Sequence, residues 1–195
     1  MAFQHPTMAM ATVGESSLAS SEPARMHDRR RVRLRQWASV ALLGIAWAGY
    51  NSLSAWQESH AFMVNASESL PNWAFFVTDN KAPDKGQYVF FSPPPGEIVD
   101  RHFGPDQGPF GKQVIGMPGS VVEHRGEWVY VDGVRVAHMK PRTRFGEELH
   151  PGPTGVVPES CYYVGTPHPD GFDSRYAEIG FACRKAILGT GTPIL

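Results

Sequence analysis

The decisive stretch of this sequence is Asn65-Ala66-Ser67-Glu68-Ser69-Leu70-Pro71, in which two serines precede a proline. A serine hydroxyl is a weak nucleophile until a nearby base activates it. A serine before a proline is also common in ordinary turns, so the stretch needs a partner elsewhere in the chain. Lys112-Gln-Val-Ile-Gly-Met-Pro-Gly119 supplies one, because it places a lysine at the head of an apolar run that ends in a Pro-Gly turn. Together the two stretches predict Ser69 as nucleophile and Lys112 as general base.

A lysine acts as a base only when its amine is neutral, so the pKa of Lys112 must fall well below that of a solvated lysine. The sequence around Lys112 favours this. Phe110, Val114, Ile115 and Met117 can surround the amine with apolar groups, and no acidic residue lies within five positions of it. An adjacent carboxylate would instead keep the lysine charged.

A third stretch, Phe172-Asp173-Ser174-Arg175-Tyr176, follows near the C-terminus. The three stretches, in this order and behind an apolar segment, resemble the signal peptidase I family, and within it most closely the TraF-type peptidases of conjugative transfer systems. The resemblance covers Asn65 to the C-terminus. It implies a serine endopeptidase without cofactors or a metal, whose partner is a translocated precursor protein such as a pilin.

The same resemblance assigns roles to individual residues. It implies that the Ser67 hydroxyl and the Ser69 N–H bind the oxyanion, a kind of contact that is typically worth about 3 kcal/mol. Leu70 and Pro71 are expected to shape the strand that pairs with substrate, although they also suit a plain chain reversal. Residues of the third stretch are expected to support the site, with an ion pair between the first and last of them; these are Asp173, Ser174 and Arg175.

Three positions depart from the family pattern. The family usually has Gly-Asp where this chain has Gly165-Thr166, and an aspartate where it has Ser120. It also has a serine that orients the lysine where this chain has Gly171. What orients Lys112 is therefore left open between Thr166, Ser174 and a water molecule.

Charge and hydropathy divide the 195 residues into three predicted regions. Residues 1–36 are rich in Ser, Ala and Met and then in arginine, and are expected to form a disordered basic cytoplasmic tail. Residues 37–56 are uncharged for a length that suits a transmembrane anchor. Residues 57–195 would then form a periplasmic peptidase domain on an inner-membrane protein. Two alternatives for the apolar segment are a cleaved signal peptide ending near Ala46-Trp47-Ala48 and a buried soluble helix.

Beyond the anchor, the chain shows short runs rich in β-branched and aromatic residues, separated by Gly and Pro. Asp132-Gly133 between two such runs predicts a hairpin. No helical period is evident there, and residues 100–111 are expected to form a loop. The fold class is therefore mostly β, a folded antiparallel sheet domain like that of signal peptidases. The predicted strands cover residues 74–77, 87–91, 113–115, 120–123, 127–131, 134–136 and 160–164.

Other chemistries find less support in the sequence. The eight histidines lack the spacing of a metal site. A Ser-His-Asp triad using Asp100 or His102 is possible, but no spacing singles out either residue. Cys161 and Cys183 could form a disulfide in an oxidising periplasm or remain buried thiols. The net charge of −1 indicates no polyanionic partner such as nucleic acid.

These observations predict a membrane-anchored Ser69/Lys112 endopeptidase that processes a translocated precursor, by hydrolysis or by cyclisation. One alternative is a non-catalytic periplasmic pilus-assembly factor that retains the peptidase fold. Another is a LexA-like self-cleaving regulator, which also pairs a serine with a lysine.

Overall fold

The computed structural model describes residues 22–65 and 69–194. The chain divides into two compact units, residues 1–53 and 54–195. Helix α1 runs from Glu22 to Ser59. Its first turn contains Pro23, where the missing N–H breaks no helical hydrogen bond. The basic segment before residue 37 is thus helical from Glu22 onward, where the sequence predicts disorder, and the predicted disorder of residues 1–21 lies outside the described residues.

The predicted transmembrane anchor at residues 37–56 is not supported. The segment is helical, but no helix in the described part of the chain combines the length and the apolar character that crossing a membrane requires. The reason lies in its composition. Although the segment is uncharged, it includes Ser39, Gly44, Gly49, Asn51 and Ser52, which lower its mean hydropathy below that of a run of aliphatic residues.

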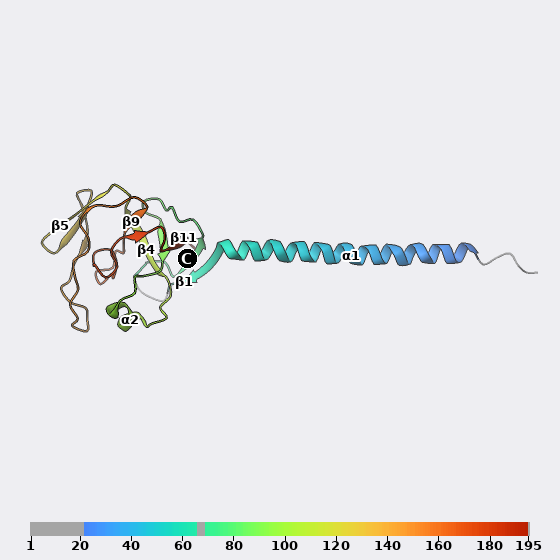
Figure 1. The fold of residues 1–195 in the computed structure, drawn as a ribbon, viewed down its shortest axis with the longest axis horizontal. Coiled ribbons are helices and arrows are strands. Elements are labelled where there is room, and N and C mark those ends of the chain that lie inside the picture. Colours follow the sequence, from blue (N-terminus) through green and yellow to red (C-terminus); the bar gives the residue numbers. More distant parts are fainter. Residues whose placement is uncertain (1–21, 66–68, 195) are drawn as a thin grey trace, which may run out of the picture. The chain divides into compact units, whose positions relative to one another are not determined.

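The larger sheet of the second unit has seven antiparallel strands, several of which are labelled in Figure 1. Its central strands, β3 and β4, are flanked on one side by β11 and on the other by β9. In sheet order the strands are β1 (His60–Val64), β2 (Ala74–Thr78), β11 (Ile187–Pro193), β3 (Tyr88–Phe91), β4 (Phe110–Gly116), β9 (Cys161–Gly165) and β10 (Ala182–Cys183).

A second antiparallel sheet has four strands. The turn between β6 and β7 is the predicted Asp132-Gly133 hairpin. Both residues adopt positive φ, 51° and 77°, as a two-residue turn of the favoured hairpin type requires. In sheet order the strands are β7 (Val134–His138), β6 (Trp128–Val131), β5 (Val121–Arg125) and β8 (Gly155–Val156).

The mostly β prediction is confirmed, and each predicted run contains or overlaps a strand. Three elements longer than two residues were not predicted. Helix α2 (Glu97–Phe103) occupies part of the expected loop; it is too short to show a helical period, and only its Val99 is buried. The edge strand β1 follows directly on α1, and β11 contains two glycines, which weaken a strand pattern.

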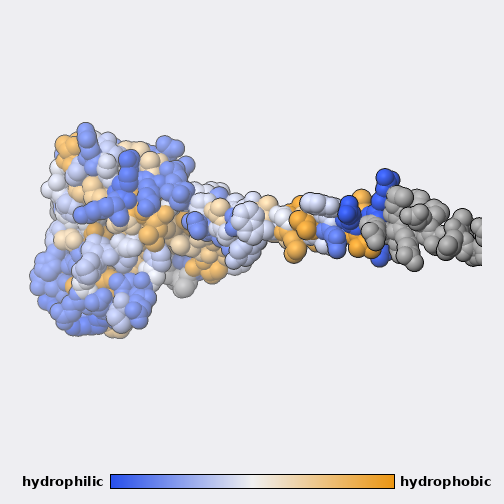
Figure 2. Space-filling model, turned by 45° about the vertical axis from the view of Figure 1, so that its right-hand side comes forward, coloured by the Kyte–Doolittle hydropathy of each residue, from blue (hydrophilic) through white to orange (hydrophobic). Residues whose placement is uncertain are grey.

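Apolar side chains pack between the sheets, whereas the face of the second unit seen in Figure 2 is mostly hydrophilic, with smaller hydrophobic patches. One buried cluster joins the four-stranded sheet to β9 through Val129, Val131 and Tyr163. Another lies on β3, β4 and β9 and includes Val89 and Val114. The strand carrying Lys112 therefore passes through apolar surroundings.

Cys161 and Cys183 form a disulfide between β9 and β10, which settles the alternatives that the sequence left open. The two residues face each other directly in the antiparallel register. The segment that the bridge closes contains the whole third stretch, Phe172 to Tyr176.

Candidate active site

Lys112 lies in β4, and it is only 5% exposed. Alternation along the strand places Phe110, Lys112 and Val114 on the same face. The Lys112 amine lies 5.9 Å from the centroid of the Phe110 ring. Across the ladder, Lys112 faces Val89 of β3, which is fully buried. Apolar side chains thus enclose the amine much as the sequence suggests.

Burial lowers the pKa of Lys112, because the charged ammonium loses its hydration in these surroundings. Two further charges act on it in opposite directions. The Asp173 carboxylate raises the pKa and the Arg175 guanidinium lowers it. Desolvation is the largest of the three influences on the pKa, followed by Asp173 and then by Arg175, so the net direction is downward.

Asn65, the last described residue before Ser69, is hydrogen-bonded to three residues that follow Ser69. The Asn65 amide nitrogen donates to the carbonyls of Leu70 (3.2 Å) and Asn72 (3.1 Å), and its backbone N–H donates to the Trp73 carbonyl (2.8 Å). Leu70 is buried, whereas Pro71 is exposed. The sequence predicts no role for Asn65, although this residue begins the decisive stretch.

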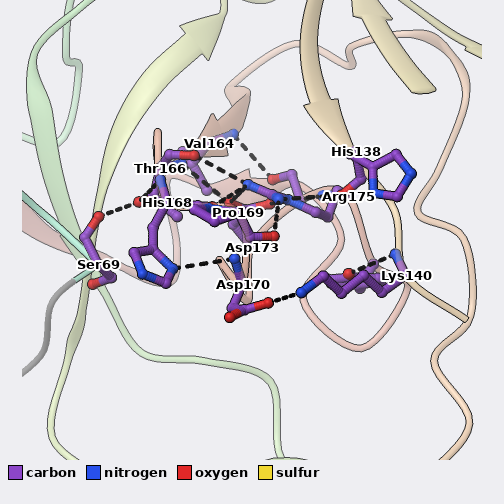
Figure 3. Close-up of polar contacts among 12 residues, drawn as sticks. Ser69, His138, Lys140, Val164, Thr166, His168, Pro169, Asp170, Asp173 and Arg175 are labelled. Carbon is purple, nitrogen blue, oxygen red and sulfur yellow. Dashed lines mark hydrogen bonds and ion pairs between the residues drawn. The ribbon is translucent and has the colours of Figure 1, made fainter. Parts of the chain in front are cut away.

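Two contacts bring the Ser69 segment against the strands around Lys112. A Cβ placed on Gly111, the neighbour of Lys112, would lie 3.3 Å from the Leu70 side chain. The Thr166 hydroxyl donates to the carbonyl of Ser69 itself (Figure 3). In β9, Gly165 pairs with Gln113 of β4, so Thr166 and Lys112 are the next residues along the same ladder. The Ser69 and Lys112 segments therefore meet at the β4–β9 end of the sheet, while Ser67 lies outside the described residues.

Asp173 and Arg175 form the predicted ion pair, which is almost completely buried, at 0% and 2% exposed. The guanidinium meets the carboxylate with two parallel contacts, Nε to Oδ1 at 2.8 Å and Nη2 to Oδ2 at 2.9 Å. Its remaining donors reach the carbonyls of Thr166 (3.0 Å), Pro169 (3.3 Å) and His138 (3.3 Å). The pair thereby fixes the loop after β9 and ties it to β7, as Figure 3 shows.

Ser174 has a bracing role and makes its contacts with β9. Its hydroxyl accepts from the Val164 N–H at 3.0 Å, and its own N–H donates to the Val164 carbonyl at 3.1 Å. Ser174 and Thr166 are the two hydroxyl residues that could replace the missing lysine-orienting serine. Ser174 is bonded to the backbone of β9, and the Thr166 hydroxyl is bonded to Ser69.

Both residues of the alternative triad lie in one short helix. Asp100 and His102 lie on α2, and the His102 ring contacts the Glu147 carboxylate. Within residues 22–65 and 69–194, no group of three or more His, Cys, Asp or Glu side chains could hold a metal ion.

A family model described as signal peptidase, peptidase S26, matches residues 34–195, which is most of the chain. The chain belongs to the peptidase S26 family. The signal peptidases of this family are serine endopeptidases that process precursor proteins.

Among solved structures, the chain is similar to a signal peptidase I from Enterococcus faecalis V583. The two share 25% sequence identity with a TM-score of 0.34, over 56% of this chain and 97% of the other. No curated protein sequence matches the chain.

Gly171 occupies the position where the S26 resemblance predicts a lysine-orienting serine, and the backbone here leaves no space for one. A Cβ at this position would lie 2.2 Å from the Thr166 Cγ2 atom, 2.8 Å from Arg175 Nη2 and 2.9 Å from Asp173 Oδ2. These atoms belong to buried, tightly bonded side chains and cannot easily move. Thr166 thus fills the volume that a side chain at position 171 would need.

Replacing Gly171 by alanine is expected to destabilise this S26 peptidase. Overpacking of this kind costs about 1–3 kcal/mol, which lowers the melting temperature by several degrees, and circular dichroism melts would measure the change. The control is Gly108→Ala, since an added Cβ at Gly108 has no neighbour within 4 Å. Equal melting temperatures for the two variants would contradict the tight packing at Gly171.

Replacing Lys112 by methionine is expected to flatten the pH dependence of stability. Between its lowered pKa in the folded state and the ordinary value of 10.5, the unfolded chain binds the proton that the folded chain releases. The wild-type free energy of unfolding must therefore rise with pH over that window. Urea titrations at several pH values would measure the slope, with Lys81→Met on the exposed surface as control. Identical slopes for wild type and Lys112→Met would show that the amine is not desolvated.

Proposed function

We propose that this chain is a serine endopeptidase whose Ser69 and Lys112 form a catalytic dyad acting on a translocated precursor. The observation that carries the proposal is the buried Lys112 amine, whose pKa is lowered and which lies on the strand against which the Ser69 segment packs. A buried amine without a dominant counter-charge is expensive to maintain, so it indicates a chemical role more than a structural one.

In the proposed reaction, the neutral Nζ of Lys112 takes the proton of the Ser69 hydroxyl as Oγ attacks the scissile carbonyl carbon. The tetrahedral oxyanion is bound by the Ser69 N–H and the Ser67 hydroxyl. As the C–N bond breaks, Lys112 returns the proton to the leaving amine. The N-terminal part of the substrate then stays attached to Ser69 as an ester.

The product depends on which group attacks this ester. Attack by water releases a carboxylate, whereas attack by the substrate's own terminal amine releases a cyclic amide. The resemblance to TraF-type peptidases supports a pilin-like precursor from a conjugative transfer system as the substrate class. Leu70, which is buried beside Gly111, would shape the surface that receives it.

We place the reaction in the periplasm, at the face of the inner membrane where a translocated precursor emerges. The Cys161–Cys183 disulfide supports this location, because disulfides persist in oxidising compartments and are rare in the cytosol.

Ser69→Ala and Lys112→Ala are each expected to abolish processing, since each removes one partner of the proton transfer. Mass spectrometry of the candidate pilin precursor, co-expressed with each full-length variant, measures the outcome. The product mass distinguishes hydrolysis from cyclisation by one water molecule. Ser92→Ala is the matched control, because Ser92 is exposed and only its backbone N–H is bonded, to the Ala186 carbonyl. Normal trimming by both dyad variants would favour the non-catalytic assembly factor.

The proposed location predicts that Cys161 and Cys183 are oxidised in cells. A maleimide reagent of high mass, added to cells lysed under denaturing conditions, should leave the wild-type band unshifted on a gel until a reductant is supplied. After reduction, both cysteines should be labelled. Labelling of both thiols without a reductant would argue against a periplasmic domain.

A further inference from the structure

The structure brings one buried hydroxyl, that of Thr166, onto the backbone of the proposed nucleophile. Thr166 is 3% exposed and lies just beyond the end of β9. Its hydroxyl has a single proton, which it donates to the Ser69 carbonyl, and it accepts from the His168 N–H at 3.2 Å. Its backbone N–H donates to Asp173 Oδ2 at 3.1 Å. Thr166 therefore connects the buried ion pair to the Ser69 segment through consecutive hydrogen bonds.

We propose that Thr166 is a positioning residue for catalysis, whose hydroxyl fixes the Ser69 backbone so that Oγ is held toward Lys112. The inference rests on the proposed Ser69/Lys112 function. It concerns which residue of the chain sets the direction of the nucleophile.

The direction of a serine Oγ follows from its backbone, because the Cα–Cβ bond is fixed by the N, Cα and C atoms and χ1 then has three staggered values. Holding the carbonyl of Ser69 restricts the rotation of this residue about its own backbone bonds. Asn65 holds the carbonyls of Leu70 and Asn72 in the same way. Side chains thus hold the carbonyls of residues 69, 70 and 72, and Thr166 acts on Ser69 itself.

Thr166 is itself rigid, which a positioning residue requires. Its backbone is held by the ion pair: Arg175 Nη2 donates to the Thr166 carbonyl at 3.0 Å, and Asp173 accepts from the Thr166 N–H. The Cγ2 methyl fills the space above Gly171. The backbone and the side chain of Thr166 are therefore both fixed. The position of its hydroxyl in turn fixes the position of the Ser69 carbonyl.

The location of Thr166 also matches the role. Gln113 of β4 pairs with Gly165 of β9, so Lys112 and Thr166 lie side by side at the end of that ladder. Thr166 thereby sets the position of the Ser69 segment relative to β4, the strand that carries Lys112. A displacement of about 1 Å between reacting groups can reduce a rate by about 10²-fold, so a single hydrogen bond at this point can have a large effect.

The test compares Thr166→Val, which keeps the shape and removes the donor, with Thr166→Ser, which keeps the donor and removes the methyl group. The probe is an internally quenched peptide selected from a library for cleavage by the full-length wild-type protein. Thr166→Val is expected to lower kcat by about 10²-fold with a nearly unchanged KM. Thr166→Ser is expected to retain most of kcat. Thr78→Val serves as the matched control, because it removes a half-buried threonine hydroxyl that contacts Thr190 on another part of the sheet.

The pH profile separates positioning from a general structural effect. Because Thr166→Val leaves the burial of Lys112 intact, the midpoint of the rising limb of kcat should stay in place while its plateau falls. Equal losses in the Val and Ser variants, or a shifted midpoint with a normal plateau, would overturn the inference.

Ser69→Ala and Lys112→Ala distinguish failure of the inference from failure of the function. If both are inactive and Thr166→Val is as active as wild type, the dyad stands and the role of Thr166 falls. If either alanine variant cleaves the peptide normally, the proposed function falls, and the inference falls with it.

Discussion

The buried ion pair of Asp173 and Arg175 is the interaction on which the site depends. Removing a charged side chain from water costs several kcal/mol, and the cost is offset only where geometry and hydrogen bonding are nearly complete. Here the carboxylate and guanidinium meet with two parallel contacts, and the other guanidinium donors reach backbone carbonyls on both sides of the pair. The loop after β9 therefore has one arrangement that satisfies these donors, and Thr166 is fixed as part of it.

The same pair allows Lys112 to remain buried without becoming a counter-ion. A lone carboxylate near the amine would stabilise the ammonium and hold the pKa up. Here Arg175 accompanies Asp173. The guanidinium lowers the pKa of the amine while the carboxylate raises it, and the loss of hydration lowers it by more than either charge changes it. At pH values below the ordinary pKa of a lysine, burying this amine lowers the free energy of unfolding. Such a local energetic cost is expected of a functional site.

The sequence allowed the β fold, the Asp132-Gly133 hairpin and the apolar surroundings of Lys112 to be predicted, because each depends on neighbouring residues or on a period of two. Thr166 could not be given its role, since its contact with Ser69 joins positions 97 residues apart. Helix α2 was too short to show a period. The anchor prediction relied on the absence of charge, whereas the ability to span a membrane depends on mean hydropathy, which the small polar residues reduce. The pairing of Ser69 with Lys112 in catalysis stays a prediction.

The disulfide connects the oxidation state of the compartment to this same loop. Cys161 and Cys183 are 22 residues apart, and the segment between them contains Thr166, Asp173 and Arg175. Closing a loop of this length in the unfolded chain is worth about 3 kcal/mol in the chain-entropy model. That magnitude is comparable to what a buried amine and a buried ion pair cost when either is imperfectly satisfied. A covalent bridge across the loop therefore helps to keep the residues around Lys112 and Ser69 in one arrangement in spite of the charges buried among them.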